Sequence, residues 1–236
     1  MTKKWIELNI TLECNWKCPC CVRLCNIKNK NPNSVMNLDD ISYITSEIKK
    51  IGLHNFEHIT IIGGEPTLNP NFVEICHYLK NNLDIKLEVS TNSSNNSKYK
   101  SIIEKMGIRY YTFGNVDNMY KKEISHINFY ISPTENSQSM RVDCGLNCGV
   151  SICKINNELI YSHCSNQIFL AYMLKSQDLL YRNLKDVMDS DSYHNRVTDN
   201  VCKHCQFMSR YRIKFHKNST ISNCFKNGLE LYRSEN

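Results

Sequence analysis

The chain has 236 residues, 41% hydrophobic and 22% charged, which is typical of a soluble globular protein and excludes a disordered or fibrous one. This length accommodates one full-sized domain, or one α/β domain with a small appended module. The formal net charge of +6 does not indicate a nucleic-acid partner, because metal-bound cysteines are thiolates and would reduce it.

The unusual feature of the composition is its 13 cysteines. They indicate either disulfides in a secreted protein or metal ligands in a reducing compartment. Polar residues interrupt any apolar signal sequence near the N-terminus, and no stretch reaches the roughly 18 apolar residues that a membrane span needs. The odd cysteine count also fits poorly with a small disulfide scaffold. We therefore expect a cytoplasmic, metal-binding protein without a membrane partner.

Strands and helices are predicted to alternate along the first 131 residues. Alternating or continuous apolar patterns predict strands over 4–12, 58–62, 85–91, 108–113 and 126–131. Helical spacing of apolar residues predicts helices over 42–51, 69–79, 98–106 and 116–124. Pro70 is expected in the first turn of the second helix. This alternation predicts an α/β fold of parallel βα units, whose ligands gather at the carboxyl ends of the strands.

A loop rich in cysteine directly follows the first predicted strand. Cys14, Cys18 and Cys21 are separated by three and by two residues, a spacing at which thiolates can surround an iron-sulfur cube or a zinc ion. Three ligands would leave one iron of a cube open to a chelating substrate. Cys20 could compete as a ligand, and a zinc site that also uses Cys25 is the structural alternative.

These residues resemble the C-x3-C-x2-C motif of the radical S-adenosylmethionine (SAM) superfamily, which follows the first strand of a partial βα barrel. The resemblance implies that Cys14, Cys18 and Cys21 hold a [4Fe-4S] cluster whose fourth iron binds the amino and carboxylate groups of SAM. In that superfamily, an electron from the cluster cleaves SAM to a 5′-deoxyadenosyl radical. Cys20 stands where the superfamily usually has an aromatic residue.

Two further segments are similar to motifs of the same superfamily. Gly63-Gly64-Glu65-Pro66 follows the second predicted strand and looks like the GGEP motif, in which glycines permit close backbone approach and the acid can meet an ammonium group. Ser90-Thr91-Asn92 is similar to a Ser-Thr-Asn-Gly strand ending, although Ser93 replaces the glycine. By this resemblance the SAM-binding residues are Gly63, Gly64, Glu65, Pro66, Ser90 and Asn92.

A second group of cysteines surrounds a predicted hairpin over 150–155 and 159–163. The layout resembles the Twitch module, a shortened SPASM extension that holds an auxiliary [4Fe-4S] cluster. The resemblance implies Cys164, Cys202 and Cys205 as ligands, with Cys144 or alternatively Cys148 as the first. Four thiolates could also bind zinc. Cys153 and Cys76 are interpreted as buried apolar cysteines.

The resemblance implies a shortened radical SAM barrel over 1–135 and a Twitch-like hairpin-plus-helix module with a C-terminal tail over 136–236. Two such clusters would lower the net charge from +6 to about +3. The layout is similar to that of 2-deoxy-scyllo-inosamine dehydrogenase, which oxidises a cyclic alcohol. We therefore expect an oxidoreductase for a small natural-product or sugar-type substrate. Its auxiliary cluster would accept an electron, and a flavodoxin- or ferredoxin-type protein would supply one.

Three alternative functions remain open. Radical SAM enzymes also modify ribosomal peptides, often with a leader-binding domain that we do not expect here, since 13 residues precede Cys14. Activases of glycyl-radical enzymes commonly have more sequence before the first cysteine. A non-catalytic zinc or iron-sulfur interaction protein would not need the GGEP-like segment. The sequence identifies no catalytic residue, and the candidates for facing a substrate are Arg23, Lys28, Tyr130 and Arg141.

Overall fold

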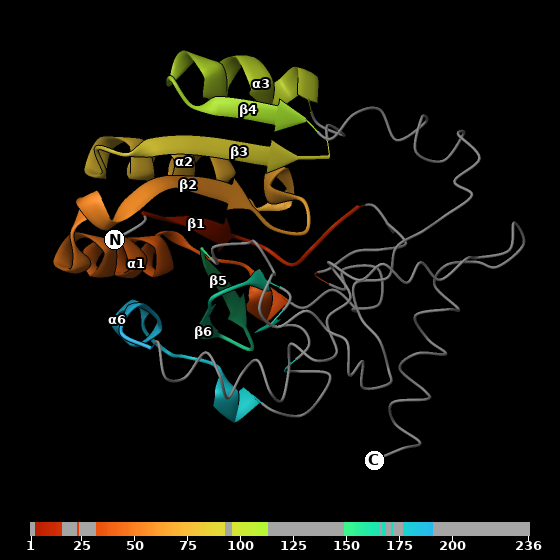
Figure 1. Cartoon of the computed structure of the whole chain (residues 1–236). Coiled ribbons are helices and arrows are strands. Elements are labelled where there is room, and N and C mark those ends of the chain that lie inside the picture. Colours follow the sequence, from red (N-terminus) through yellow and green to blue (C-terminus); the bar gives the residue numbers. More distant parts are fainter. Residues whose placement is uncertain are drawn as a thin grey trace, which may run out of the picture.

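The computed structural model describes residues 3–15, 23, 32–92, 96–112, 149–165, 167–168, 171 and 177–190. These residues form a six-stranded sheet with the order β4-β3-β2-β1-β5-β6 (Figure 1). The strands are β1 (Lys4–Asn9), β2 (Phe56–Ile62), β3 (Lys86–Thr91), β4 (Arg109–Thr112), β5 (Val150–Ile155) and β6 (Glu158–Ser162). Among these six described strands, only β6 is antiparallel to its neighbour, so the sheet is predominantly parallel, as an α/β fold requires.

The first three helices lie between strands in the chain, in the predicted alternation, and a short helix follows the last described strand. They are α1 (Leu38–Ile51), α2 (Phe72–Asn82), α3 (Asn96–Lys105) and α6 (Leu184–Met188), with short 3-10 helices η1 (Pro32–Ser34), η2 (Leu53–Asn55), η3 (Pro66–Leu68) and η4 (Gln177–Leu179). The first helix begins with a capping box, in which the side chains of Asn37 and Asp40 each accept a hydrogen bond from the other residue's backbone amide.

The expected position of Pro70 in the first turn of the second helix is wrong. Helix α2 begins at Phe72, with Asn71 as its N-terminal cap residue. The reason is the side chain of Asn69, which donates to two backbone carbonyls outside the helix and accepts from the Asn71 amide at 2.8 Å. These bonds hold the chain in a turn before the helix can start.

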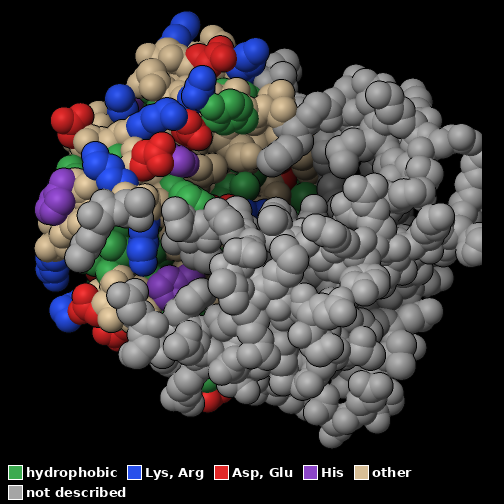
Figure 2. Space-filling model, viewed as in Figure 1, with side chains coloured by type: hydrophobic (Ala, Val, Ile, Leu, Met, Phe, Trp, Pro, Cys, Tyr) green, Lys and Arg blue, Asp and Glu red, His purple; other side chains and the backbone are tan. Residues whose placement is uncertain are grey.

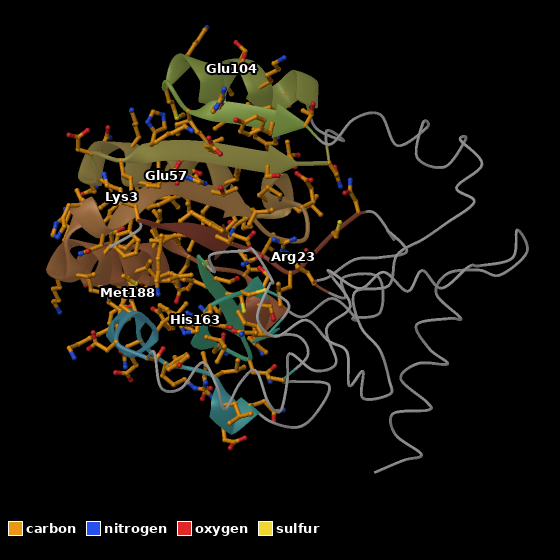
Figure 3. All side chains as sticks on the ribbon, viewed as in Figure 1. Lys3, Arg23, Glu57, Glu104, His163 and Met188 are labelled. Atoms are coloured by element: carbon orange, nitrogen blue, oxygen red, sulfur yellow. The ribbon has the colours of Figure 1, made fainter. Side chains whose placement is uncertain are left out.

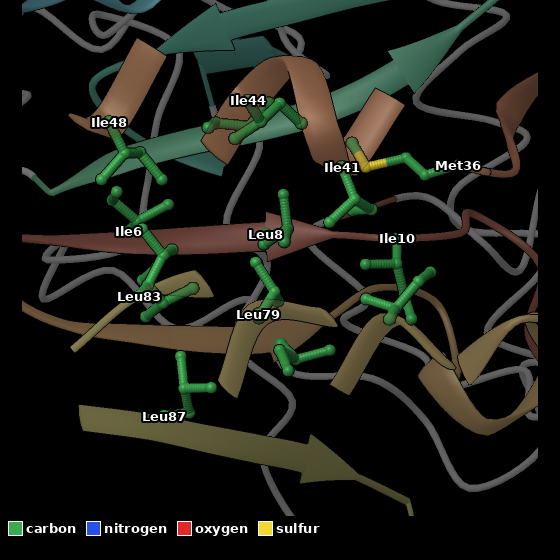
Figure 4. Close-up of a cluster of buried hydrophobic side chains, with 14 of the residues drawn as sticks. Ile6, Leu8, Ile10, Met36, Ile41, Ile44, Ile48, Leu79, Leu83 and Leu87 are labelled. Carbon is green, nitrogen blue, oxygen red and sulfur yellow. The ribbon is translucent and has the colours of Figure 1, made fainter. Parts of the chain in front are cut away.

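The core lies between the sheet and its helices. The side chains of Ile6, Leu8 and Ile10 are buried between α1 and α2 (Figure 4). The helical residues that complete this part of the core include Ile41, Ile44, Ile48, Ile75 and Leu79. Burial of each such side chain contributes about 1.5 to 3 kcal/mol relative to exposure. This apolar face therefore accounts for the attachment of the helices to the sheet.

The opposite face of the sheet carries mainly polar residues. Successive residues of a strand point to opposite sides of the sheet, so Glu7 lies on the side opposite Ile6. Paired residues of neighbouring parallel strands point to the same side, so Thr60, which pairs with Glu7, lies on this side as well. The polar residues of this face include Glu7, Asn9, Thr60, Glu88, Ser90 and Ser151. Near β4, Glu88 forms ion pairs with Lys86 at 2.7 Å and Arg109 at 3.7 Å. Figure 2 shows basic and acidic side chains close together over this part of the molecule.

The C-terminal hairpin belongs to the same sheet as the N-terminal strands, because β5 pairs in parallel with β1. Its turn is Asn156-Asn157, and both residues have positive φ, 52° and 67°. Asparagine tolerates this left-handed backbone, so the turn does not require glycine. On the helix side, Lys154 binds Asp40 at 2.7 Å and the Tyr161 hydroxyl donates to Glu47 at 2.5 Å. Burial, more than the neighbouring carboxylate, raises the pKa of Tyr161, so its hydroxyl remains a donor.

Several predictions of the sequence lie outside the described residues: the helix over 116–124, the strand over 126–131 and the boundary between 135 and 136. They remain predictions. None of the helices in the described ranges has the length and hydropathy needed to cross a membrane.

Candidate functional site

The loop after β2 lies directly against the chain that leaves β1. The backbone amide of Gly64 donates to the Thr11 carbonyl at 2.8 Å, and that of Glu65 donates to the Glu13 carbonyl at 2.7 Å. A Cβ atom added to Gly63 would lie 2.4 Å from the Thr11 carbonyl oxygen, and one added to Gly64 would lie 2.1 Å from the Glu13 carbonyl oxygen. Only glycine permits this approach. The two glycines therefore place the first cysteine of the loop beside the GGEP-like segment.

Glu65 holds the ends of β2 and β3 together. Its carboxylate is fully buried. One oxygen accepts from the Thr67 amide at 3.1 Å and from the Thr67 and Thr91 hydroxyls at 2.6 Å each. The other oxygen accepts from the Asn92 amide at 2.7 Å. Four donors satisfy the buried charge, which would otherwise be costly.

Asn92 carries this connection to the cysteine loop. Its side-chain amide donates to Asn15 Oδ1 at 2.8 Å and lies 3.9 Å from Cys14 Sγ, within range for a hydrogen bond to sulfur. Ser90 is buried on the polar face of β3, and Pro66 is buried at the start of η3. The carboxyl ends of β1, β2 and β3 thus bring Cys14 and Asn92 together next to Glu65.

This arrangement fits an iron-sulfur cluster. Cys14 is partly exposed at the strand ends, so its sulfur is accessible to a cluster, and amide donors to the sulfurs of a cluster tune its potential. Cys18 and Cys21 lie outside the described residues. Among the residues that the structure describes, no group of three or more His, Cys, Asp or Glu could hold a metal ion. The convergence of the three cysteines therefore stays a prediction.

Cys164 is the described member of the second cysteine group. It lies just beyond β6, where Ser162 Oγ donates to its carbonyl oxygen at 3.2 Å. The other candidate ligands, Cys144, Cys148, Cys202 and Cys205, lie outside the described residues. The structure therefore places one of the predicted ligands next to the hairpin that pairs with β1.

Two cysteines and a histidine are buried. Cys76 lies in the core, where burial raises the pKa of its thiol, and Cys153 is buried in β5, as both were interpreted. His163 is also buried, with Nε2 at 2.9 Å from Ser190 Oγ and its ring edge-on to Tyr181. Burial makes the Cys76 thiol unreactive, because it disfavours the thiolate.

The sequence alone missed a polar cluster next to the site. Of the candidates for facing a substrate, Arg23 is described, and it lies beside the carboxyl end of β1 (Figure 3). Lys28, Tyr130 and Arg141 are outside the described residues. Arg23 contacts Glu7 and Asn9, which alternate with apolar residues along β1. That alternation was the available signal, although it marks a face of the strand without revealing which residues meet on it.

Comparisons with known proteins identify a family and a fold that this chain shares. The family model described as the radical SAM superfamily matches residues 8–128, just over half of the chain. GTP 3′,8-cyclase of Haemophilus influenzae is 30% identical over 105 residues, 44% of this chain and 30% of the relative. A probable GTP 3′,8-cyclase of Methanococcus maripaludis is 31% identical over 102 residues, which are 43% of this chain and 33% of the relative. The matched stretch thus spans about a third of these relatives' length.

Two solved structures share the fold. The match to the crystal structure of BtrN in complex with AdoMet and 2-DOIA covers 89% of this chain and 95% of the BtrN chain, with a TM-score of 0.57 and 12% identity. The match to BtrN in an open conformation covers 86% of this chain and 88% of the BtrN chain, with a TM-score of 0.52 and 12% identity. The matching segment of the family model includes Cys14, the two glycines, Glu65 and Asn92. The chain belongs to the radical SAM superfamily, whose members bind SAM at a [4Fe-4S] cluster.

Proposed function

We propose that this protein binds SAM at a [4Fe-4S] cluster held by Cys14, Cys18 and Cys21 and uses it to remove a hydrogen atom from a substrate. The observation that carries the proposal is the meeting of Cys14 and Asn92 beside the buried Glu65 carboxylate at the ends of three parallel strands. When bound, the cluster and SAM would supply the radical chemistry. The protein's part is to hold the ligands and the substrate and to exclude water.

Glu65 has a defined part in this proposal. Its four hydrogen bonds go to protein donors, and its side chain is fully buried. We therefore assign it to positioning: it fixes Asn92, which in turn contacts Cys14 and Asn15. The sequence-based expectation of a contact with the SAM ammonium group stays a prediction.

The reaction we propose is the oxidation of a small natural-product or sugar-type substrate. An auxiliary [4Fe-4S] cluster, held by Cys164, Cys202, Cys205 and either Cys144 or Cys148, would accept the second electron. Two observations support this direction: the fold is shared with BtrN, whose complex contains AdoMet and 2-DOIA, and Cys164 adjoins the hairpin paired with β1. A flavodoxin- or ferredoxin-type protein would reduce the first cluster.

The first test is reconstitution with iron and sulfide under anaerobic conditions. The protein should bind about eight irons as two cubanes. After reduction it should convert SAM to 5′-deoxyadenosine and methionine, measured by chromatography. Stoichiometric zinc, with no visible iron-sulfur absorbance and no SAM cleavage, would instead support the interaction-protein alternative.

The second test concerns the auxiliary cluster. Replacing both Cys202 and Cys205 by Ala should lower the iron content from about eight to about four per chain and leave SAM cleavage in place, because the first cluster keeps its ligands. Formation of a two-electron-oxidised product should stop, with 2-DOIA as the first compound to assay. Full product yield from a variant with one cluster would exclude the auxiliary site as electron acceptor.

A further inference from the structure

Five polar side chains form a closed ring of contacts, here called the polar ring, on the face of the sheet opposite the helices. Arg23 Nε donates to Asn9 Oδ1 at 2.6 Å, and Asn9 Nδ2 donates to Ser151 Oγ at 3.1 Å. Ser151 Oγ and Ser165 Oγ are 2.8 Å apart, and the Ser165 hydroxyl donates to Glu7 Oε2. Arg23 Nη2 closes the ring at 3.5 Å from the same carboxylate oxygen.

The hydrogen bonds of the polar ring run in one direction. The Glu7 carboxylate can only accept, so the Ser165 hydroxyl uses its single hydrogen there. Ser165 must then accept from Ser151, which itself accepts from Asn9. Donation therefore proceeds from the Arg23 guanidinium, through an amide and two hydroxyls, to a carboxylate. Such a chain is mutually reinforcing, and loss of one member affects the others.

Burial makes the polar ring sensitive to substitution. Asn9, Ser151 and Ser165 are 0%, 1% and 5% exposed. Removing a partner from such groups leaves a buried donor or acceptor without its hydrogen bond. The ring is therefore held as one arrangement, whereas an exposed ion pair would sample many.

The members of the polar ring come from the segments that carry the cysteines. Arg23 is two residues after Cys21, and Ser165 directly follows Cys164. Glu7 and Asn9 lie on β1, the strand that leads to the cysteine loop, and Ser151 lies on β5 beside it. The ring thus connects the C-terminal part of the first cysteine loop to the segment that holds Cys164.

Two other buried polar links of the hairpin, among the residues that the structure describes, do not make this connection. Lys154 with Asp40, and Tyr161 with Glu47, join the hairpin to α1 on the helix side of the sheet. They anchor β5 and β6 but contact neither cysteine segment. They therefore provide matched controls, since their loss would weaken the hairpin and leave the polar ring intact.

We infer that the polar ring sets the relative position of the two cysteine sites, with Arg23 and Ser165 as positioning residues for both. The inference rests on the proposed function, because it assigns a cluster to each site. In the part of the chain that the structure describes, Asn92 acts on the first site, through Asn15 and Cys14. Disrupting the ring should therefore disturb both clusters, and replacing Asn92 should disturb one.

The test uses the full chain, reconstituted anaerobically, in the variants Arg23→Met, Arg23→Lys and Ser165→Ala. Iron retention against a chelator should fall about 10- to 100-fold at both sites, as for other groups that orient metal ligands. The electron paramagnetic resonance signals of both reduced clusters should change. Arg23→Lys should recover only part of the loss, because lysine cannot reproduce the fork of the guanidinium. Asn92→Ala should alter only the first cluster's signal.

Lys154→Met is the control for general destabilisation. It should lower the melting temperature of the apoprotein and leave both cluster signals unchanged, because Lys154 lies on the helix side. If the ring variants lower the melting temperature but leave both signals and iron retention unchanged, the ring is merely structural and the inference fails. If variants lacking the predicted ligands of either site keep all their iron, the proposed function fails instead.

Discussion

Replacing Glu65 by Ala should lower the free energy of unfolding by about 3 to 5 kcal/mol, because it leaves buried donors without an acceptor. The groups affected are the amides of Thr67 and Asn92 and the hydroxyls of Thr67 and Thr91. The measurement is urea denaturation of the apoprotein. SAM binding by the reconstituted protein should weaken as well, because Asn92 is no longer fixed.

Three variants make this result specific. Glu65→Gln keeps one carbonyl oxygen and should have an intermediate effect. Thr91→Val removes one donor without changing the shape of the side chain, and should cost about 1 kcal/mol. Glu74→Ala removes an exposed carboxylate from α2 and should change stability by less than about 0.5 kcal/mol. Unchanged stability of Glu65→Ala, combined with lost SAM binding, would favour a direct contact between Glu65 and SAM over the positioning role assigned to Glu65.

Replacing Cys14, Cys18 and Cys21 together by Ala should abolish SAM cleavage and reduce the iron content from about eight to about four per chain. The second cluster, whose ligands lie elsewhere, should remain. Iron and sulfide analysis, visible absorbance and the yield of 5′-deoxyadenosine measure the outcome. Iron content equal to that of the unsubstituted protein would show that these cysteines are not cluster ligands.

Two single substitutions test whether the effect is specific to the predicted ligands. One replaces a buried cysteine, and the other replaces the cysteine that could take the place of Cys21. Cys76→Ala changes a thiol in the core, where burial raises its pKa, so both clusters and SAM cleavage should survive. Cys20→Ala should also retain both clusters if Cys21 is the third ligand. Loss of the first cluster in Cys20→Ala, with retention in a separate Cys21→Ala variant, would reassign that ligand.

The local sequence determined the elements and the first site's motif. Helical spacing from Ser42 to Ile51 predicted most of α1, and the apolar pattern at 58–62 predicted most of β2. The Asn156-Asn157 turn separates two apolar runs and was predicted as a hairpin. Each of these features depends on neighbours within a few residues. Propensity and periodicity act at that range. The GGEP-like segment was identified for the same reason.

The tertiary structure alone decided which distant residues meet. Pairing of β5 with β1 joins residues more than 140 positions apart, and Ser165 reaches Glu7 across 158 positions. Glu65 could have faced a ligand, yet the ends of β3 and η3 surround it with four donors. No local pattern specifies such contacts, because they follow from the register of strands and from which buried polar groups must satisfy one another. The polar ring arises in this way, from residues that are individually ordinary in the sequence.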